Sequence, residues 1–190
     1  MGNCLIYCQP SGKKWEKVVK DLEGGSEQVI NDFRGEFYHN IDNKGRLSIP
    51  RKFAARLIEE DEGRVVVTRG VDRCLWIYPH SKFEETTSKM QQLSLFDPDA
   101  QLFLNTFYGT SHDDTLDKTG RILVPKHLLV DYAEIYKEIV IVGAMYLIQV
   151  WSLENWRRQI EKSTTNPNEI ASKMASHFSN MHSQMKGTNP

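Results

Sequence analysis

The sequence predicts an α+β fold, mainly β with short helices, built from two tandem copies of one β element. Three observations carry this prediction. A loop of the pattern Asp-x-x-Gly-Arg occurs at Asp42–Arg46 and again at Asp117–Arg121, 75 residues later. Apolar and polar residues alternate after each loop, as in a strand that is buried on one face. The chain of 190 residues, 39% of them hydrophobic, is long enough to bury a core.

The two loops contain the residues that a tight turn requires. An Asp carboxylate can accept hydrogen bonds from backbone donors two residues further on. A glycine three residues after the aspartate supplies a positive φ at little steric cost. Asp42 with Gly45, and Asp117 with Gly120, are therefore predicted to shape the loops, and the following arginine to begin a strand.

The strand that follows the first loop has one apolar face. Leu47 and Ile49 are expected to point inward, with Arg46 and Ser48 on the outer face. In the second copy Ile122 and Val124 take the inward positions, and Leu123 stands where Ser48 stands. Pro50 and Pro125 end these strands and can open helices, which we expect at residues 51–60 and 126–133.

The similarity continues downstream, so each copy is expected to run loop, strand, short helix, strand, turn, strand, helix. Residues 65–67 and 139–141 are β-branched runs followed by a glycine, and residues 75–78 and 148–151 form a second matching pair. Residues 79–108 look helical, with a break at Asp97–Pro98. The aromatic side chains of these strands and helices are expected in the core or a subunit interface rather than in a base-stacking platform: Trp76, Tyr78, Trp151 and Trp156.

These patterns divide the chain into five parts. We expect an N-terminal extension at 1–32, a first repeat at 33–92, a helical linker at 93–109, a second repeat at 110–162 and a tail at 163–190. Two explanations of the extension stay open: an arm with a small helix around Trp15 and Val18, or a start site placed too early. The tail could be a docking helix, because Ile170 and Met174 have helical spacing, or a frayed end.

Overall composition excludes several classes of protein. The formal net charge is −1, so nucleic-acid binding needs a local basic patch. The three cysteines match neither a disulfide framework nor a zinc site, which predicts a reducing compartment and no metal or cofactor. The longest mostly apolar stretch, Ile139 to Trp151, is shorter than the ~20 residues of a membrane helix. We therefore expect a cytoplasmic protein without a membrane span or a small-molecule substrate.

A local basic patch is present around the first loop. Six cations between Arg34 and Arg56 stand against two carboxylates, a net charge of +4, and an acidic run follows at residues 59–62. The planar donors of arginine suit phosphate groups and guanine edges. The DNA-contacting candidates are Arg46 and Arg121, with Lys44, Lys118 and Arg34 as helpers. The alternative interpretation is a purely structural turn with an internal Asp–Arg salt bridge. Two copies of the loop in one chain, each with lysines nearby, favour a binding surface over this alternative.

At this point the residues resemble a known family. The segment Phe33–Pro50, the second loop at Leu116–Pro125 and the segment Val150–Trp156 resemble MraZ proteins. The resemblance implies two tandem SpoVT/AbrB-like swapped-hairpin elements that form an intrachain pseudo-dimer, and a ring-shaped homo-oligomer. It also implies a nucleoid-associated DNA-binding regulator, usually a repressor, of repeated boxes upstream of the division and cell-wall gene cluster. It assigns DNA contact mainly to the arginine of each loop.

Parts of the sequence are compatible with two other functions. A hydrolase or metal site could use the polar run at His112–Asp114 with Asp117, but the sequence has no nucleophile motif, phosphate loop or recognised metal spacing, and His112 lies where turn residues are expected. We therefore expect no enzyme and no catalytic residue. A protein-binding antitoxin or a structural assembly protein could share the same fold class. The tandem arrangement argues against an antitoxin, which usually has one repeat.

Overall fold

A computed structural model describes residues 32–165, 171–172 and 175–176. The expectations for the N-terminal extension and for the helical spacing at Ile170 and Met174 lie outside these residues. No helix in the described part of the chain is long and apolar enough to cross a membrane.

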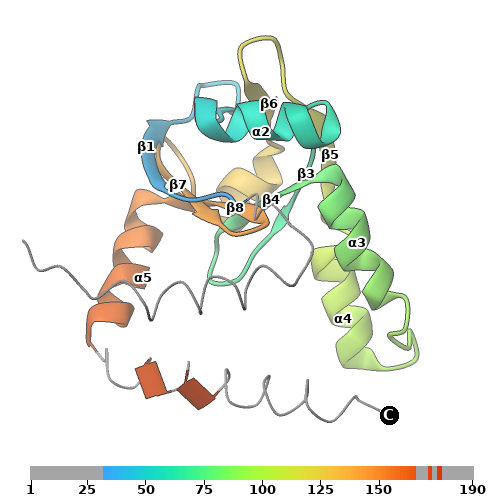
Figure 1. Cartoon of the computed structure of the whole chain (residues 1–190). Coiled ribbons are helices and arrows are strands. Elements are labelled where there is room, and N and C mark those ends of the chain that lie inside the picture. Colours follow the sequence, from blue (N-terminus) through green and yellow to red (C-terminus); the bar gives the residue numbers. More distant parts are fainter. Residues whose placement is uncertain (1–31, 166–170, 173–174, 177–190) are drawn as a thin grey trace, which may run out of the picture. The chain divides into compact units, whose positions relative to one another are not determined.

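Most of the strands join one antiparallel sheet. Its members are β1 (Glu36–Asn40), β3 (Arg64–Arg69), β4 (Leu75–Pro79), β5 (His112–Thr115), β7 (Glu138–Ala144) and β8 (Leu147–Ser152). Their order is β1-β7-β8-β4-β3-β5 (Figure 1). The hairpins β3–β4 and β7–β8 are the expected strand–turn–strand units of the two copies, so that prediction is confirmed.

The two halves of the chain exchange strands. β1 of the first half pairs with β7 of the second, and β5 of the second half pairs with β3 of the first. β4 and β8 join the hairpins in the middle of the sheet. A second, two-stranded sheet pairs β2 (Arg46–Ser48) with β6 (Arg121–Leu123), again one strand from each half. Each half therefore completes the other.

The core lies between the two sheets. Leu47 and Ile122, opposite each other in the two-stranded sheet, are buried, and so are Ile49 and Val124, as the alternation predicted. They pack with the inner faces of β3, β4, β7 and β8. A smaller cluster joins sheet residues to residues of the two helices between the repeats, and it contains Val66, Tyr78, Phe83, Phe107 and Leu147.

The helices occupy the expected places. They are α2 (Arg51–Asp61), α3 (His80–Met90), α4 (Pro98–Phe107), a π-helix η1 (His127–Tyr132) and α5 (Leu153–Thr165). Asp97 caps α4 by accepting a hydrogen bond from the Asp99 N–H at 3.0 Å, with Pro98 as the first helical residue, so the predicted break is confirmed. Helices and antiparallel strands together confirm the α+β class. α5 continues past residue 162, where the second repeat was expected to end.

Three elements differ from the prediction, and one of them is β1, a strand before the first loop that was not expected. His112, expected among turn residues, begins strand β5, whose charged sequence His-Asp-Asp-Thr is tolerated because β5 is an edge strand with mostly exposed side chains. The second helix is a six-residue π-helix rather than a copy of the eleven-residue α2. α2 is followed directly by Glu62 with a φ of +57°, whereas η1 is followed by Ala133 with a φ of −88° and only then by Glu134 with a φ of +55°.

Candidate nucleic-acid interface

The aspartate of the first loop braces its turn. The Asp42 carboxylate accepts hydrogen bonds from the backbone N–H groups of Lys44 and Arg46, both at 2.8 Å. The Gly45 N–H donates to the Asp42 carbonyl at 3.0 Å. Gly45 has a φ of +79°, in the left-handed region that glycine adopts most easily. In this loop the carboxylate therefore binds backbone donors, and the glycine takes the left-handed conformation.

The second loop repeats this backbone. The Asp117 carboxylate accepts from the N–H groups of Thr119 at 2.8 Å and of Arg121 at 3.0 Å. Gly120 has a φ of +75°, and its N–H donates to the Asp117 carbonyl at 2.9 Å. The Thr119 hydroxyl adds a further hydrogen bond to the same carboxylate at 2.6 Å. The carboxylate of this loop therefore has more donors than that of the first.

These hydrogen bonds keep both aspartates ionised. The Arg46 backbone N–H is the main cause that lowers the pKa of Asp42, with the Lys44 N–H helping against partial desolvation. The Thr119 hydroxyl is the main cause that lowers the pKa of Asp117 far below its usual range. Both side chains are negative at neutral pH, so they are suited to orient the loops and unsuited to contact a polyanion.

The two loop arginines share one face of the two-stranded sheet. Arg46 stands opposite Leu123, and Arg121 stands opposite Ser48. Because Leu47 and Ile122 between them point inward, Arg46 and Arg121 point outward as diagonal neighbours. Such neighbours in an antiparallel pair lie roughly 7–8 Å apart. The charge of Arg121 also helps to lower the pKa of Asp42, which fits this proximity.

The two arginines differ in their partners. The Arg121 guanidinium donates to Asp117 through Nε at 3.1 Å and forms an ion pair through Nη2 at 3.0 Å. Within the described residues, no carboxylate oxygen lies within 4.0 Å of the Arg46 guanidinium nitrogens, although the Arg46 backbone N–H donates to Asp42. The second loop thus contains the internal salt bridge of the structural interpretation, and the first loop does not.

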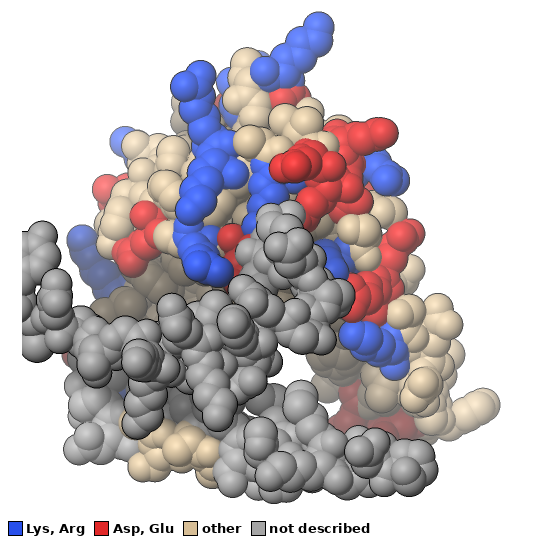
Figure 2. Space-filling view, viewed as in Figure 1, with Lys and Arg blue, Asp and Glu red and all other residues tan. Residues whose placement is uncertain are grey.

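Unpaired cations gather around the loops. In the part of the chain that the structure describes, the side chains of six cations on the loops or just after the loop strands have no carboxylate oxygen within 4.0 Å: Lys44, Arg46, Arg51, Lys52, Lys118 and Lys126. Figure 2 shows Lys and Arg side chains gathered on the upper part of the displayed face, with acidic side chains beside them. Arg56, counted in the sequence patch, instead pairs with Glu60 at 2.8 Å and lies over the Phe33 ring.

The acidic run at the end of the first helix, residues 59–62, is partly structural. The Asp61 side chain is buried and accepts hydrogen bonds from the Ser81 N–H at 3.0 Å and the Ser81 hydroxyl at 2.9 Å. It therefore ties α2 to the start of α3. Glu60 forms an ion pair with Arg56. The sequence alone suggested a uniformly negative surface, but two of the four carboxylates of this run have partners within the protein.

Arg34 does not lie with the loops. It precedes β1, whereas the first loop follows β1, so the strand separates them by up to roughly 25 Å. Its side chain is exposed and pairs with Asp32 at 3.1 Å. Lys44 and Lys118 are exposed on the loops themselves. The structure thus brings four of the five proposed contact residues together and leaves the fifth apart.

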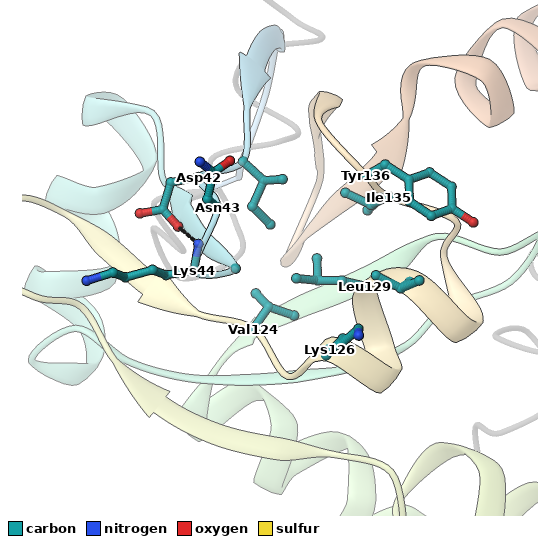
Figure 3. Close-up of a pocket in the computed structure, with 11 residues that line it drawn as sticks. Asp42, Asn43, Lys44, Val124, Lys126, Leu129, Ile135 and Tyr136 are labelled. Atoms are coloured by element: carbon teal, nitrogen blue, oxygen red, sulfur yellow. Dashed lines mark hydrogen bonds between the residues drawn. The ribbon is translucent and has the colours of Figure 1, made fainter.

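A pocket of about 370 Å³ lies between the first loop and the second half of the chain. Ile41, Val124 and Leu129 form its apolar part, and Asn43 and Lys126 belong to its polar lining (Figure 3). The Lys44 side chain points away from the pocket in this view, while its N–H faces Asp42. The first loop is therefore built against residues of the other repeat.

The polar run before the second loop has structural partners. Asp114 accepts a hydrogen bond from the Leu123 N–H at 2.6 Å, which ties β5 to β6. Asp113 is exposed on β5, with its carboxylate 3.8 Å from a ring nitrogen of His80. Neighbouring residues on a strand point to opposite faces, so this run does not converge on one point.

Sequence reasoning did not single out Lys126 and Arg51 as contact residues. Each directly follows the proline at the end of its loop strand, and both occupy the same place in the repeat. That equivalence was the signal available in the sequence. Their spatial relation to the loops depends on strand exchange, which the repeat alone does not reveal.

Comparison with known proteins agrees with this geometry. The family model described as "MraZ protein, putative antitoxin-like" matches the chain twice, over residues 33–106 and 107–178. Relatives named transcriptional regulator MraZ occur in Caldicellulosiruptor saccharolyticus, Thermomicrobium roseum and Clostridium acetobutylicum. They are 38%, 38% and 37% identical to this chain, covering 74%, 75% and 75% of it and 94%, 97% and 96% of their own length. These names describe regulators and not enzymes. With both copies matched and with such identity over almost the whole of these relatives, the chain belongs to the MraZ family.

Proposed function

We propose that this chain is a sequence-specific regulator of transcription that binds double-stranded DNA through Arg46 and Arg121. Lys44 and Lys118 add contacts to the phosphates. The observation that carries the proposal is the position of both arginines on the outer face of one two-stranded sheet, each beside a turn braced by its aspartate. The name shared by the relatives supports the same function.

The chemistry of this surface suits DNA. A two-stranded β ribbon fits the major groove, and arginine can donate two hydrogen bonds to the O6 and N7 atoms of guanine. The exposed lysines can neutralise phosphates, which supplies affinity without sequence information. Arg34, at the other end of β1 and paired with Asp32, is a separate contact in this proposal and the weakest of the five.

The resemblance adds finer parts to the proposal. The protein acts mainly as a repressor of the division and cell-wall gene cluster, associates with the nucleoid, and binds repeated upstream boxes as a ring-shaped homo-oligomer. One chain carries one two-loop surface, so several boxes in a row require several chains. Exposed apolar side chains on and before α4 support contact between subunits, among them Leu95, Phe96, Leu102 and Phe103, with Phe96 99% exposed.

Those apolar side chains also favour a second candidate function. A protein-binding antitoxin or an assembly protein would bury the same side chains against a different protein. The two candidates differ in what the purified chain does alone. A DNA-binding regulator protects specific DNA without a second protein, whereas a purely protein-binding role gives no protection.

The test is footprinting with the purified full chain on the DNA upstream of its own gene. We expect protection of repeated short boxes, no protection of unrelated DNA of equal length, and affinity that falls steeply as salt rises. The mass of the free protein, from light scattering during size-exclusion chromatography, reports whether it is an oligomer. Folded protein that protects no upstream DNA at low salt would contradict the proposed function.

A further inference from the structure

We infer that each DNA contact is composite: the loop of one repeat works together with the cation that follows the helix-opening proline of the other repeat. Lys126 completes the first loop, and Arg51 completes the second. Both side chains bind phosphates beside the base pairs that Arg46 and Arg121 contact. This inference rests on the proposed function and adds two binding residues to it.

Backbone hydrogen bonds cross between the repeats at both loops. The Val124 N–H donates to the Gly45 carbonyl at 3.0 Å, and the Ile49 N–H donates to the Gly120 carbonyl at 2.9 Å. Lys126 is two residues beyond Val124, and Arg51 is two residues beyond Ile49. Each cation therefore comes two residues after a backbone hydrogen bond that joins its own strand to the loop of the opposite repeat.

The helices pack against the opposite loops in the same crossed manner. A Cβ added to Gly45 would lie 3.3 Å from Leu129 Cδ1, and one added to Gly120 would lie 3.6 Å from Ala54 Cβ. Leu129 and Ala54 stand three residues after Lys126 and Arg51, in the segments that these two cations open. Lys126 also lines the pocket of the first loop together with Asn43 and Lys44 (Figure 3).

Both cations are available for an external anion. Lys126 and Arg51 are exposed and, among the residues described, have no carboxylate within 4.0 Å. Arg56, which also lies on α2, is instead paired with Glu60. An unpaired cation beside a DNA-contacting loop gains from phosphate contact without first losing an internal partner. The same logic applies twice, which makes the surface a two-fold repeat within one chain.

The first test is the salt dependence of binding to the footprinted box, for Lys126→Gln and Arg51→Gln. The matched control is Lys89→Gln, on α3, whose amino group pairs with Glu85 at 3.4 Å. Log affinity falls with log salt concentration by about 0.9 for each phosphate contact. Each variant should therefore make this salt dependence shallower by about 0.9. Base preference should remain, and the control should match the unaltered chain. Slopes equal to that of the control would overturn the inference.

The second test asks which loop each cation accompanies. Single phosphates of the box are replaced by neutral methylphosphonates, and the phosphate whose replacement no longer matters in Lys126→Gln is identified. For Lys126→Gln, we expect this phosphate to lie next to the base pair whose identity no longer affects binding in Arg46→Ala. For Arg51→Gln, we expect the corresponding phosphate to lie next to the base pair whose identity no longer affects binding in Arg121→Ala. A Lys126 phosphate beside the Arg121 base pair would contradict the crossed arrangement. If the unaltered chain binds no box at all, the proposed function fails instead.

Discussion

The two Asp-x-x-Gly-Arg loops have the same backbone and different side-chain partners. In both, the aspartate accepts hydrogen bonds from the residues two and four positions on, and the glycine has a positive φ. Thr119 stands where the first loop has Lys44, and its hydroxyl binds Asp117. The Arg121 guanidinium also binds Asp117, whereas the Arg46 guanidinium has no carboxylate partner among the described residues.

This difference separates two roles that the sequence pattern combines. The turn is made by backbone hydrogen bonds, so it forms in both loops regardless of what the arginine does. The arginine is then either held by its own loop or left for a ligand. An internal ion pair must be broken or shared before Arg121 can bind DNA fully, and no such cost applies to Arg46. Arg46 is therefore expected to contribute more to binding.

The largest difference between the loops should be in the free energy of unfolding that each loses when its glycine is replaced. Gly45→Ala places a Cβ 3.1 Å from the Val124 carbonyl oxygen and 3.3 Å from Leu129, in addition to the left-handed backbone. Gly120→Ala meets only Ala54 at 3.6 Å. The left-handed conformation costs about 1–2 kcal/mol in each, and crowding raises the loss for Gly45→Ala to about 3 kcal/mol. Urea unfolding checks this, and equal losses would show that the loops are packed alike.

The next effect concerns DNA affinity. Arg46→Ala should weaken binding to the specific box by about 1–3 kcal/mol, or about 5–150-fold, as for the loss of an arginine contact to a base. Arg121→Ala should cost less than about tenfold, because its guanidinium is shared with Asp117. Fluorescence anisotropy at fixed salt measures both, with Lys89→Ala as control. A larger loss for Arg121→Ala than for Arg46→Ala would reverse the proposed ranking.

The smallest effect is in the titration of the two aspartates. Both have a pKa lowered from 3.8, so their stabilising hydrogen bonds are fully present above that pH and are lost as the pH falls through the lowered values. Binding between about pH 6 and about pH 8 should therefore show no change from these two groups. Carboxyl NMR should find Asp117 titrating below Asp42, and Thr119→Val should raise the pKa of Asp117. If the pKa of Asp117 is the same in that variant, the Thr119 hydroxyl does not lower it.

Much of the fold follows from local patterns. The repeat predicted both loops, the strands after them, the two hairpins and the helices that follow, because turn chemistry and alternation act over a few residues. The strand β5 was missed because His-Asp-Asp-Thr has no apolar alternation, and it forms only because β3 offers an edge. The π-helix was missed because the repeat suggested a copy of α2.

The candidate site was less accessible from sequence. The loop residues could be identified, but the sharing of one face by Arg46 and Arg121 depends on the pairing of β2 with β6, residues 75 apart. The place of Arg34 at the other end of β1, and the use of Arg56 by Glu60, also depend on the folded chain. Net charge along a segment therefore overstated the basic patch, because it counts cations that have partners.

The measurement that most directly tests the central claim is the affinity of Arg46→Ala/Arg121→Ala for the footprinted upstream box. We expect the double variant to keep the unfolding free energy of the unaltered chain and to lose preference for the box over unrelated DNA. Arg34→Ala, at the far end of β1, should keep that preference. A folded double variant that binds the box as tightly as the unaltered chain would show that the two loops do not read DNA.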